Sequence, residues 1–331
     1  MRNLSRSEVL RGLLGLSAAA TLPRTAHAQN FTFSVGHPLG TQDSIHIGAL
    51  RLKEYAEQKS GGRITINVFP GGVLGGSREM AQQMQRGEIF GVIDATAKFQ
   101  SFVPEFALLD IPFLADDASS AFRIMDSSTV AHLINDKAIQ GGFQAVHGWE
   151  VSFRNIYTKS RPIQAIADLK GLKIRVIPAP TYINLFKSFG AAPTAMDFGE
   201  LYTALQQGVV DGAENDILTY QNSKHFEVAP LLAITRHIML INAFFVSHSV
   251  WSSLPPDIRT ILSEASLEAR KATMDDRTRR EATAVGGLKA AGVKVSEPDL
   301  APFIQASQQT RPWFTEKFGD EAVKALVNAK G

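Results

Sequence analysis

The sequence contains no cysteine, and this absence limits both how the protein is held together and what chemistry it performs. Disulfide bonds, thiolate metal ligands and a cysteine nucleophile are all excluded. So is attachment to a membrane through a lipid on an N-terminal cysteine. A chain of 331 residues, 44% of them hydrophobic, is long enough to fold around its core without disulfides.

Long hydrophobic runs are also missing. Beyond the N-terminus, no apolar stretch approaches the roughly 18–20 residues of a membrane-spanning helix. The N-terminus itself starts with Arg2, Arg6 and Arg11, continues into the short apolar stretch "GLLGLSAAATL" and ends in "AHA". This order is typical of a secretory signal peptide at residues 1–28. We expect cleavage after Ala28 and a periplasmic protein that is not itself inserted in the membrane.

The mature chain has no excess of charge of one sign. Residues 1–28 hold four of the 34 basic residues and one of the 32 acidic residues, which leaves 30 basic and 31 acidic residues and a net charge of −1. No basic block interleaved with aromatic residues occurs, which argues against nucleic acid as a partner. The one basic run, "RKATMDDRTRR" at 270–280, also contains two aspartates and predicts a solvent-facing helix surface.

Signatures of common enzyme classes are absent as well. Neither G-x-S-x-G nor H-E-x-x-H occurs. The glycine-rich "PGGVLGGS" at 70–77 lacks the lysine of a phosphate-binding loop, so we expect close backbone packing there instead. The eight histidines do not cluster at ligand spacing. We therefore expect no metal ion and no cofactor.

What the sequence does contain is an alternation of strand and helix patterns. Helices are indicated at 44–62 and 77–87, and they separate strand patterns at 31–36, 63–70 and 89–96. This β-α-β-α-β order predicts an α/β protein with a mostly parallel sheet and helices on its faces. A second unit of the same kind follows residues 143–158.

Length and the two units together predict two α/β domains. Residues 233–248 are strand-rich and long enough to run from one domain to the other, and a long helix is indicated after them. A chain that crosses between its domains more than once should form a hinge. We expect residues 29–152 with 241–280 to form domain I, and residues 153–240 with 281–331 to form domain II.

The stretch "DLKGLKIRVIPAP" at 168–180 places an arginine in a strand. Leu172, Ile174 and Val176 alternate onto one face, and Arg175 points to the other. The ordinary interpretation of such an arginine is a solvent-facing side chain.

The neighbourhood of Arg175 favours a different interpretation. Arg154 ends another strand, and Phe198 and Asn215 stand at strand-to-helix junctions of the same unit. In parallel α/β sheets these junctions line the ligand crevice. Two guanidinium groups, an amide and an aromatic ring suit recognition of a carboxylate. Asp216, which follows Asn215, has a plainer alternative role as a cap of the next helix.

Several segments together resemble a known family. "SGGRITINVFPGGVLGGSREM", "PEFALLDIPFL", "DLKGLKIRV" and "LYTALQQGVVDGAEN" are similar to the DctP-type solute-binding subunits of TRAP (tripartite ATP-independent periplasmic) transporters, over about residues 31–318. The resemblance implies a two-domain periplasmic binding protein (flytrap) fold with a ligand cleft between the domains. It implies small and large membrane subunits as partners and uptake driven by an ion gradient. We expect a monomer.

The resemblance also implies roles for individual residues. Arg175 matches the main carboxylate anchor of the family and Arg154 its second arginine. Asn215 matches an asparagine beside the carboxylate, and Phe198 matches a ring packed on the ligand. Glu79 matches an acid that meets ligand hydroxyl groups in some members, and it is equally well explained as a first-turn acid favoured by the helix dipole.

The ligand class is less closely specified. "AENDILTY" differs from the "QENPL" of several members, so dicarboxylate or sialic acid specificity does not transfer. A polar lining of Glu79, Asn215, Asp216 and His37 favours a hydroxylated acid such as a uronate or aldonate. C4-dicarboxylates and keto acids are alternatives.

Two other functions stay open: a sensor subunit that presents its ligand to a membrane receptor, and an exported lyase or isomerase that uses Glu79 and His37. We expect a binding protein rather than an enzyme.

Overall fold

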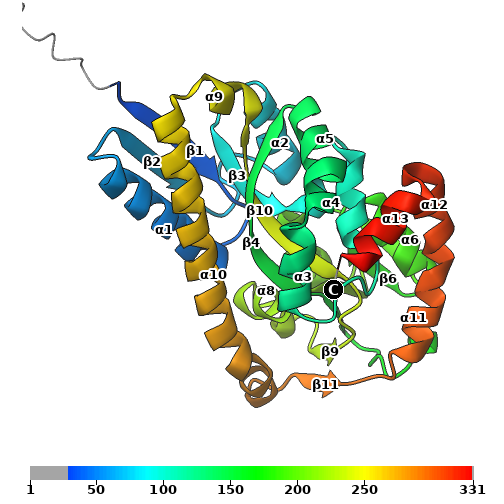
Figure 1. Ribbon diagram of the computed structural model, residues 1–331. Helices are drawn as coiled ribbons and strands as arrows, with labels where there is room; N and C mark the ends of the chain where they lie inside the picture. The colour runs from blue at the N-terminus through cyan, green and yellow to red at the C-terminus, as the bar shows by residue number, and fades with distance from the viewer. Residues whose placement is uncertain (1–28, 330–331) are drawn as a thin grey trace, which may run out of the picture.

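The computed structural model describes residues 29–329, which form two β-sheets with helices packed around them (Figure 1). The predicted signal peptide lies outside the described residues. The first sheet has the order β2-β1-β3-β10-β4 and consists of β1 (Phe31–Gly36), β2 (Ile64–Phe69), β3 (Gly91–Ala95), β4 (Phe143–Phe153) and β10 (Met239–Ser247). The second has the order β11-β9-β5-β8-β6-β7 and consists of β5 (Asn155–Thr158), β6 (Lys173–Val176), β7 (Ala192–Ala195), β8 (Gly212–Asn215), β9 (Leu231–Ala233) and β11 (Lys294–Ser296).

Helices lie between most of these strands. They are α1 (Ser44–Lys59), α2 (Ser77–Gln85), α3 (Ala118–Met125), α4 (Ser128–Val130), α5 (Asp136–Gln140), α6 (Pro180–Ser188), α7 (Leu201–Gln207), α8 (Ile217–Asn222), α9 (His248–Ser253), α10 (Pro256–Ala290), α11 (Ala301–Ser307), α12 (Arg311–Phe318) and α13 (Asp320–Asn328). Three short 3₁₀ turns matter for the site: η2 (Thr96–Phe99), η3 (Pro104–Asp110) and η6 (Phe198–Glu200).

The predicted α/β class is confirmed, and both sheets are mixed. β1 pairs in parallel with β2 and β3, as the β-α-β-α-β pattern predicts. β10 then joins antiparallel to both β3 and β4. In the second sheet β6 is parallel to β7 and β8, whereas β5 is antiparallel to β8 and β9. The antiparallel strands are those at which the chain passes between the sheets.

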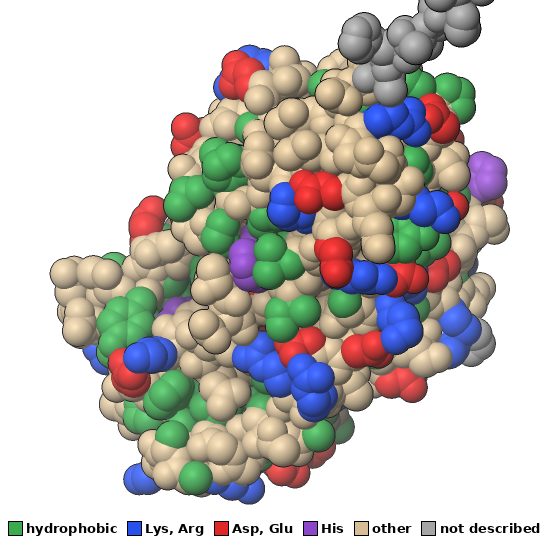
Figure 2. Space-filling view, turned by 90° about the vertical axis from the view of Figure 1, so that its left-hand side faces the viewer, with side chains coloured by type: hydrophobic (Ala, Val, Ile, Leu, Met, Phe, Trp, Pro, Cys, Tyr) green, Lys and Arg blue, Asp and Glu red, His purple; other side chains and the backbone are tan. Residues whose placement is uncertain are grey.

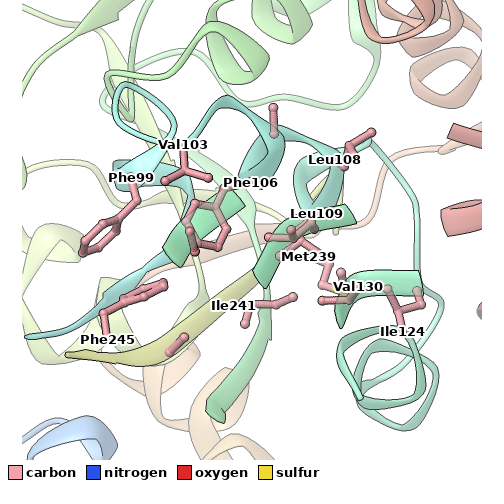
Figure 3. Close-up of a cluster of buried hydrophobic side chains, with 14 of the residues drawn as sticks. Phe99, Val103, Phe106, Leu108, Leu109, Ile124, Val130, Met239, Ile241 and Phe245 are labelled. Carbon is pink, nitrogen blue, oxygen red and sulfur yellow. The ribbon is translucent and has the colours of Figure 1, made fainter. Parts of the chain in front are cut away.

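Aromatic and aliphatic side chains form the core on one face of the first sheet. Figure 3 shows Phe99, Phe106 and Phe245 lying against one another, and the ring centroids of Phe99 and Phe245 are 4.2 Å apart. The other face is covered by α1, whose buried residues recur every three or four positions, and by α10. The sheet is therefore covered on both faces.

The chain passes between the two sheets twice at one place, from β4 to β5 and from β9 to β10. Only Arg154 separates β4 of the first sheet from β5 of the second. Its backbone N–H donates to the carbonyl of Ile238 at 2.9 Å, and the N–H of His237 donates to the carbonyl of Arg154 at 3.2 Å. The prediction that residues 233–248 run from one unit to the other is confirmed. A third crossing follows α10, which leads to β11 (Figure 1).

The prediction of a solvent-facing surface at 270–280 is wrong at Arg277. This side chain is only 2% exposed. Its Nη1 donates to Glu150 of β4 at 3.1 Å, and its Nη2 donates to Asp216, just before α8, also at 3.1 Å. One cation of α10 therefore contacts a carboxylate from each sheet. The pattern within the helix did not indicate this, because both partners come from distant segments.

The domain boundaries stay a prediction, and the packing of the C-terminal helices bears on one of them. Phe314 of α12 and Val323 and Leu326 of α13 are buried in the same cluster as Val92 and Phe245 of the first sheet. We propose on this basis that residues 311–329 belong with domain I, in contrast to their predicted place in domain II.

The surface carries charges of both signs. Figure 2 shows acidic and basic side chains next to one another over one face of the molecule. Within residues 29–329, no helix combines the length and the hydrophobicity needed to cross a bilayer.

The close contact between α1 and α10 depends on Gly48. A β-carbon at this position would lie 2.0 Å from Oγ1 of Thr273 and 3.1 Å from the carbonyl oxygen of Ala269. We expect Gly48→Ala to lower the free energy of unfolding by about 1–3 kcal/mol, because the two helices must move apart. Urea denaturation measures this change.

Gly286 supplies the matched control. It also lies within a helix, but a β-carbon there meets no atom within 4 Å. Gly286→Ala should therefore stabilise the protein slightly, by up to about 1 kcal/mol. If both substitutions lowered the free energy of unfolding equally, close packing at Gly48 would not be the cause of the loss in Gly48→Ala.

Candidate functional site

A cleft between the two sheets collects polar side chains from both of them. β3, η2 and β10 supply one wall, and β6, β8 and η6 supply the other. The lining residues are Leu39, Ile93, Asp94, Ala95, Lys98, Arg154, Arg175, Ile177, Phe198, Asn215, Thr219, Leu240 and Asn242. Four of the seven predicted site residues are among them: Arg154, Arg175, Phe198 and Asn215.

Arg175 is buried in this cleft without a counterion. Its residue is 1% exposed, so the solvent-facing interpretation is wrong. Nε and Nη2 both donate to the backbone carbonyl of Met196, at 2.9 and 2.7 Å. Among the ion pairs of residues 29–329, none involves Arg175. Burial lowers the pKa of Arg175, although a guanidinium stays protonated in a protein.

The remaining donors of Arg175 form one edge of the guanidinium. A guanidinium has five N–H groups, and the Met196 carbonyl takes one from Nε and one from Nη2. Two N–H groups on Nη1 and one on Nη2 are left without a partner in the described part of the chain. Parallel N–H groups on Nη1 and Nη2 match the two oxygens of a carboxylate.

Arg154 lies beside Arg175 but is already neutralised. Its Nε and Nη2 donate to the two carboxylate oxygens of Glu214, and Nη2 also donates to the Glu214 carbonyl at 2.7 Å. Its Nη1 donates to Oδ1 of Asn215 at 2.9 Å. Four of its five N–H groups are thus occupied. Burial opposes charge on Arg154, but the Glu214 carboxylate raises its pKa above the usual value.

Glu214 is a residue that the sequence analysis missed. It is fully buried in β8, and burial would raise its pKa, but Arg154 and His237 hold that pKa below its usual value. Its Oε2 lies 3.5 Å from Nε2 of His237. The sequence did offer a signal, because Glu214 is an acid inside an otherwise apolar strand and a buried acid requires a cationic partner.

The neighbours of Glu214 on β8 and α8 have separate roles. Oδ1 of Asn215 accepts from Arg154 and from the backbone N–H of Asp216, which leaves the Asn215 amide N–H₂ free toward the cleft. Asp216 lies outside the lining. Its Oδ1 accepts from the N–H groups of Leu218 and Thr219, so it caps α8, as the alternative interpretation predicts.

The opposite wall contains an ion pair that the sequence analysis also missed. Nζ of Lys98 lies 2.8 Å from Oδ1 of Asp94, the second-to-last residue of β3. The same Nζ lies 6.0 Å from the ring centroid of Phe198 across the cleft. The available signal was an acid inside a buried strand, at Asp94, which favours a nearby cation such as Lys98.

The structure does not bring Glu79 or His37 into the cleft. Glu79 is exposed in the first turn of α2, which fits its explanation as a first-turn acid. His37 is fully buried after β1, and its Nε2 lies 3.1 Å from Nδ1 of His46. Burial lowers the pKa of His37 to about 4. The geometry therefore does not support these two residues as an acid–base pair. No group of metal-ligating side chains occurs within residues 29–329.

Comparison with known proteins assigns the chain to a family. The profile described as bacterial extracellular solute-binding protein, family 7 (DctP) matches residues 35–317. The chain belongs to this family. The resemblance predicted from the sequence is confirmed, and so is the two-domain fold of periplasmic binding proteins, which the solved structures below share.

Relatives of this family extend over nearly the whole chain. The sialic acid-binding periplasmic protein SiaP of Vibrio cholerae is 29% identical over 97% of this chain and 98% of its own. A TRAP periplasmic solute-binding protein from Polaromonas sp. JS666, bound to D-erythronate, has 31% identity and a TM-score of 0.86, covering 90% of this chain and 98% of its own. The sugar acid binding protein DctPAm from Advenella mimigardefordensis, in complex with galactonate, has 27% identity and a TM-score of 0.87, covering 91% and 98%.

Asp110 connects the two walls behind the cleft. Its Oδ2 accepts from Nε2 of Gln100 at 2.5 Å, and its Oδ1 lies 3.4 Å from the hydroxyl of Tyr182 in α6. Burial raises the pKa of Asp110 to about 8, although Arg154 opposes the shift. At Asp110 the folded protein therefore binds more protons than the unfolded chain does between about pH 4 and pH 8.

We expect Asp110 to lower the free energy of unfolding as pH rises through this interval, because a carboxyl with a raised folded-state pKa must ionise at a cost in the folded state. His37 and His225, whose pKa burial lowers to about 4, act in the opposite direction below about pH 6.5, so the difference between wild type and variant is the quantity to compare. Asp110→Asn should reduce this slope and make the variant more stable than the wild type at pH 8. Burial also raises the pKa of Glu150 to about 8, so the Asp110→Asn variant should still lose some stability as pH rises. Urea denaturation at pH 5, 6.5 and 8 gives the comparison. If the free energy of unfolding changed with pH equally in the wild type and in Asp110→Asn, the raised pKa of Asp110 would be contradicted.

Proposed function

We propose that this protein captures a small hydroxylated organic acid, such as an aldonate or a uronate, in the periplasm and delivers it to the membrane subunits of a TRAP transporter. The carboxylate of the ligand binds to Arg175. Its hydroxyl groups contact the polar side chains of the same cleft.

The unpaired charge of Arg175 is the observation that carries this proposal. Three arginines of residues 29–329 are almost completely buried: Arg154, Arg175 and Arg277. Arg154 pairs with Glu214, and Arg277 pairs with Glu150 and Asp216. A buried cation without a partner is costly, so Arg175 requires an anion from outside the chain. A carboxylate satisfies both the charge and the free Nη1–Nη2 edge.

The surroundings of Arg175 favour a monocarboxylate that carries hydroxyl groups. The free amide of Asn215 lies beside the guanidinium, and the ring of Phe198 offers a surface for packing. The far wall carries both a carboxylate and an ammonium group, in Asp94 and Lys98. Relatives that bind D-erythronate and galactonate support the same ligand class. Two or three charge-assisted hydrogen bonds at about 1.5–3 kcal/mol each, together with ring packing on Phe198 and the release of water, reach the roughly 8 kcal/mol of micromolar affinity.

Delivery to a transporter follows from the family and from the hinge. The backbone crossing at Arg154 lets the two sheets close over a ligand bound between them. The closed form presents a different surface to the small and large membrane subunits, and an ion gradient drives uptake. The protein acts as a monomer after the signal peptide has been removed.

We expect the mature protein to bind galactonate or glucuronate with micromolar affinity in calorimetric titrations. Arg175→Lys should weaken this binding by about 10- to 100-fold, because lysine cannot copy the two parallel N–H groups. Arg175→Ala should weaken it further and leave no measurable heat.

Arg161→Lys is the matched control for these titrations. Arg161 also bonds to backbone carbonyls, those of Asp168 and Lys170, but it is exposed and outside the cleft. The Arg161→Lys variant should bind galactonate and glucuronate with the same affinity as the wild type. Near-normal affinity in Arg175→Lys, or no binding of any carboxylate by the wild type after removal of co-purified ligand, would overturn the proposed function.

A further inference from the structure

One oxygen of Asp94 is buried in the cleft without a hydrogen-bond partner. Asp94 is 3% exposed at the end of β3. Its Oδ1 accepts from the backbone N–H of Ala95 and pairs with Nζ of Lys98, both at 2.8 Å. Its Oδ2 has no partner among the described residues. The ion pair with Lys98 explains why the chain tolerates a buried acid here, but it accounts for only one of the two oxygens.

An unpartnered carboxylate oxygen can be satisfied only by a donor. An ionised carboxylate accepts hydrogen bonds and cannot donate them. Asp94 lines the same cleft as Arg175, so a ligand held by its carboxylate at Arg175 extends toward Asp94. The group that reaches Oδ2 must therefore carry an N–H or an O–H.

Lys98 restricts the choice further. Its Nζ has three N–H groups, one of which is used by Asp94, and its side chain is 13% exposed in the same cleft. The wall thus presents an acceptor and a donor side by side. A hydroxyl group is both a donor and an acceptor, and it satisfies the two together. A second carboxylate of a ligand can accept from Lys98, but it is repelled by Asp94 and leaves Oδ2 of Asp94 without a donor.

We propose that Asp94 accepts a hydrogen bond from a ligand hydroxyl group and, with Lys98 donating to the same or a neighbouring hydroxyl, selects hydroxylated monocarboxylates against dicarboxylates. This inference rests on the proposed function and specifies the substrate class of the same cleft. It assigns the recognition of hydroxyl groups to Asp94 of β3, and not to Glu79, which is exposed on α2.

The wild-type protein gives the first test and needs no substitution. Three four-carbon acids are compared by calorimetry: D-erythronate, which has three hydroxyl groups, butanoate, which has none, and succinate, a dicarboxylate. We expect D-erythronate to bind at least about 10-fold more tightly than either of the others, as one charge-assisted hydrogen bond implies. Equal or tighter binding of succinate would overturn the inference.

Asp94→Asn then tests the residue itself. The substitution keeps the shape of the side chain but replaces an acceptor oxygen by an N–H₂ group and removes the negative charge. Affinity for D-erythronate should fall about 10- to 100-fold, affinity for butanoate should stay within about twofold, and affinity for succinate should rise. An unchanged ratio between D-erythronate and butanoate would contradict the role of Asp94.

Glu79→Gln is the matched control, because it makes the same chemical change at the exposed acid outside the cleft. It should leave all three affinities unchanged, and a loss of D-erythronate binding in this variant would return the role to Glu79. The two proposals fail differently. If the wild type binds neither these three acids nor galactonate or glucuronate, the proposed function is wrong. If it binds them and Asp94→Asn preserves their order, only the inference about Asp94 is wrong.

Discussion

The buried guanidinium of Arg175 has no counterion among the described residues, and the arrangement of the cleft depends on this. The backbone carbonyl of Met196 holds the Nε–Nη2 edge of the side chain and fixes the orientation of the remaining edge. The free N–H groups therefore point at a defined place before a ligand arrives. Because a carbonyl is neutral, this contact positions Arg175 without cancelling its charge. The cleft keeps an unsatisfied positive charge that a carboxylate can neutralise.

Arg154 serves the opposite purpose. Glu214 cancels its charge, so the site presents one net cation at this end rather than two that repel one another. The same residue forms the backbone crossing between the sheets, where its N–H bonds to Ile238. Arg277 of α10 adds a second connection, through Glu150 on one side and Asp216 on the other. Asp216 in turn caps the helix that follows Asn215. Residues at the cleft and residues at the hinge are thus joined by direct contacts.

Local patterns predicted the parts of this protein that depend on neighbours in sequence. Alternating apolar residues predicted the strand at Arg175, and the helix pattern at 77–87 predicted α2. Contacts between distant segments were not predictable in this way. Glu214 meets Arg154, sixty residues earlier, and Arg277 meets carboxylates from two other segments, so neither contact could be predicted from neighbouring residues. The resemblance indicated Arg175, Arg154, Asn215 and Phe198, all of which line the cleft, but it pointed to Glu79 where the structure places Asp94.

A crystal structure of the mature protein with D-erythronate would show where the carboxylate of the ligand binds. We expect it at the free edge of Arg175, with oxygens about 2.7–2.9 Å from Nη1 and Nη2, while Nε still donates to Met196. A ligand whose carboxylate rests on Lys98 or Arg154, with the Nη1 of Arg175 left unpaired, would contradict this expectation.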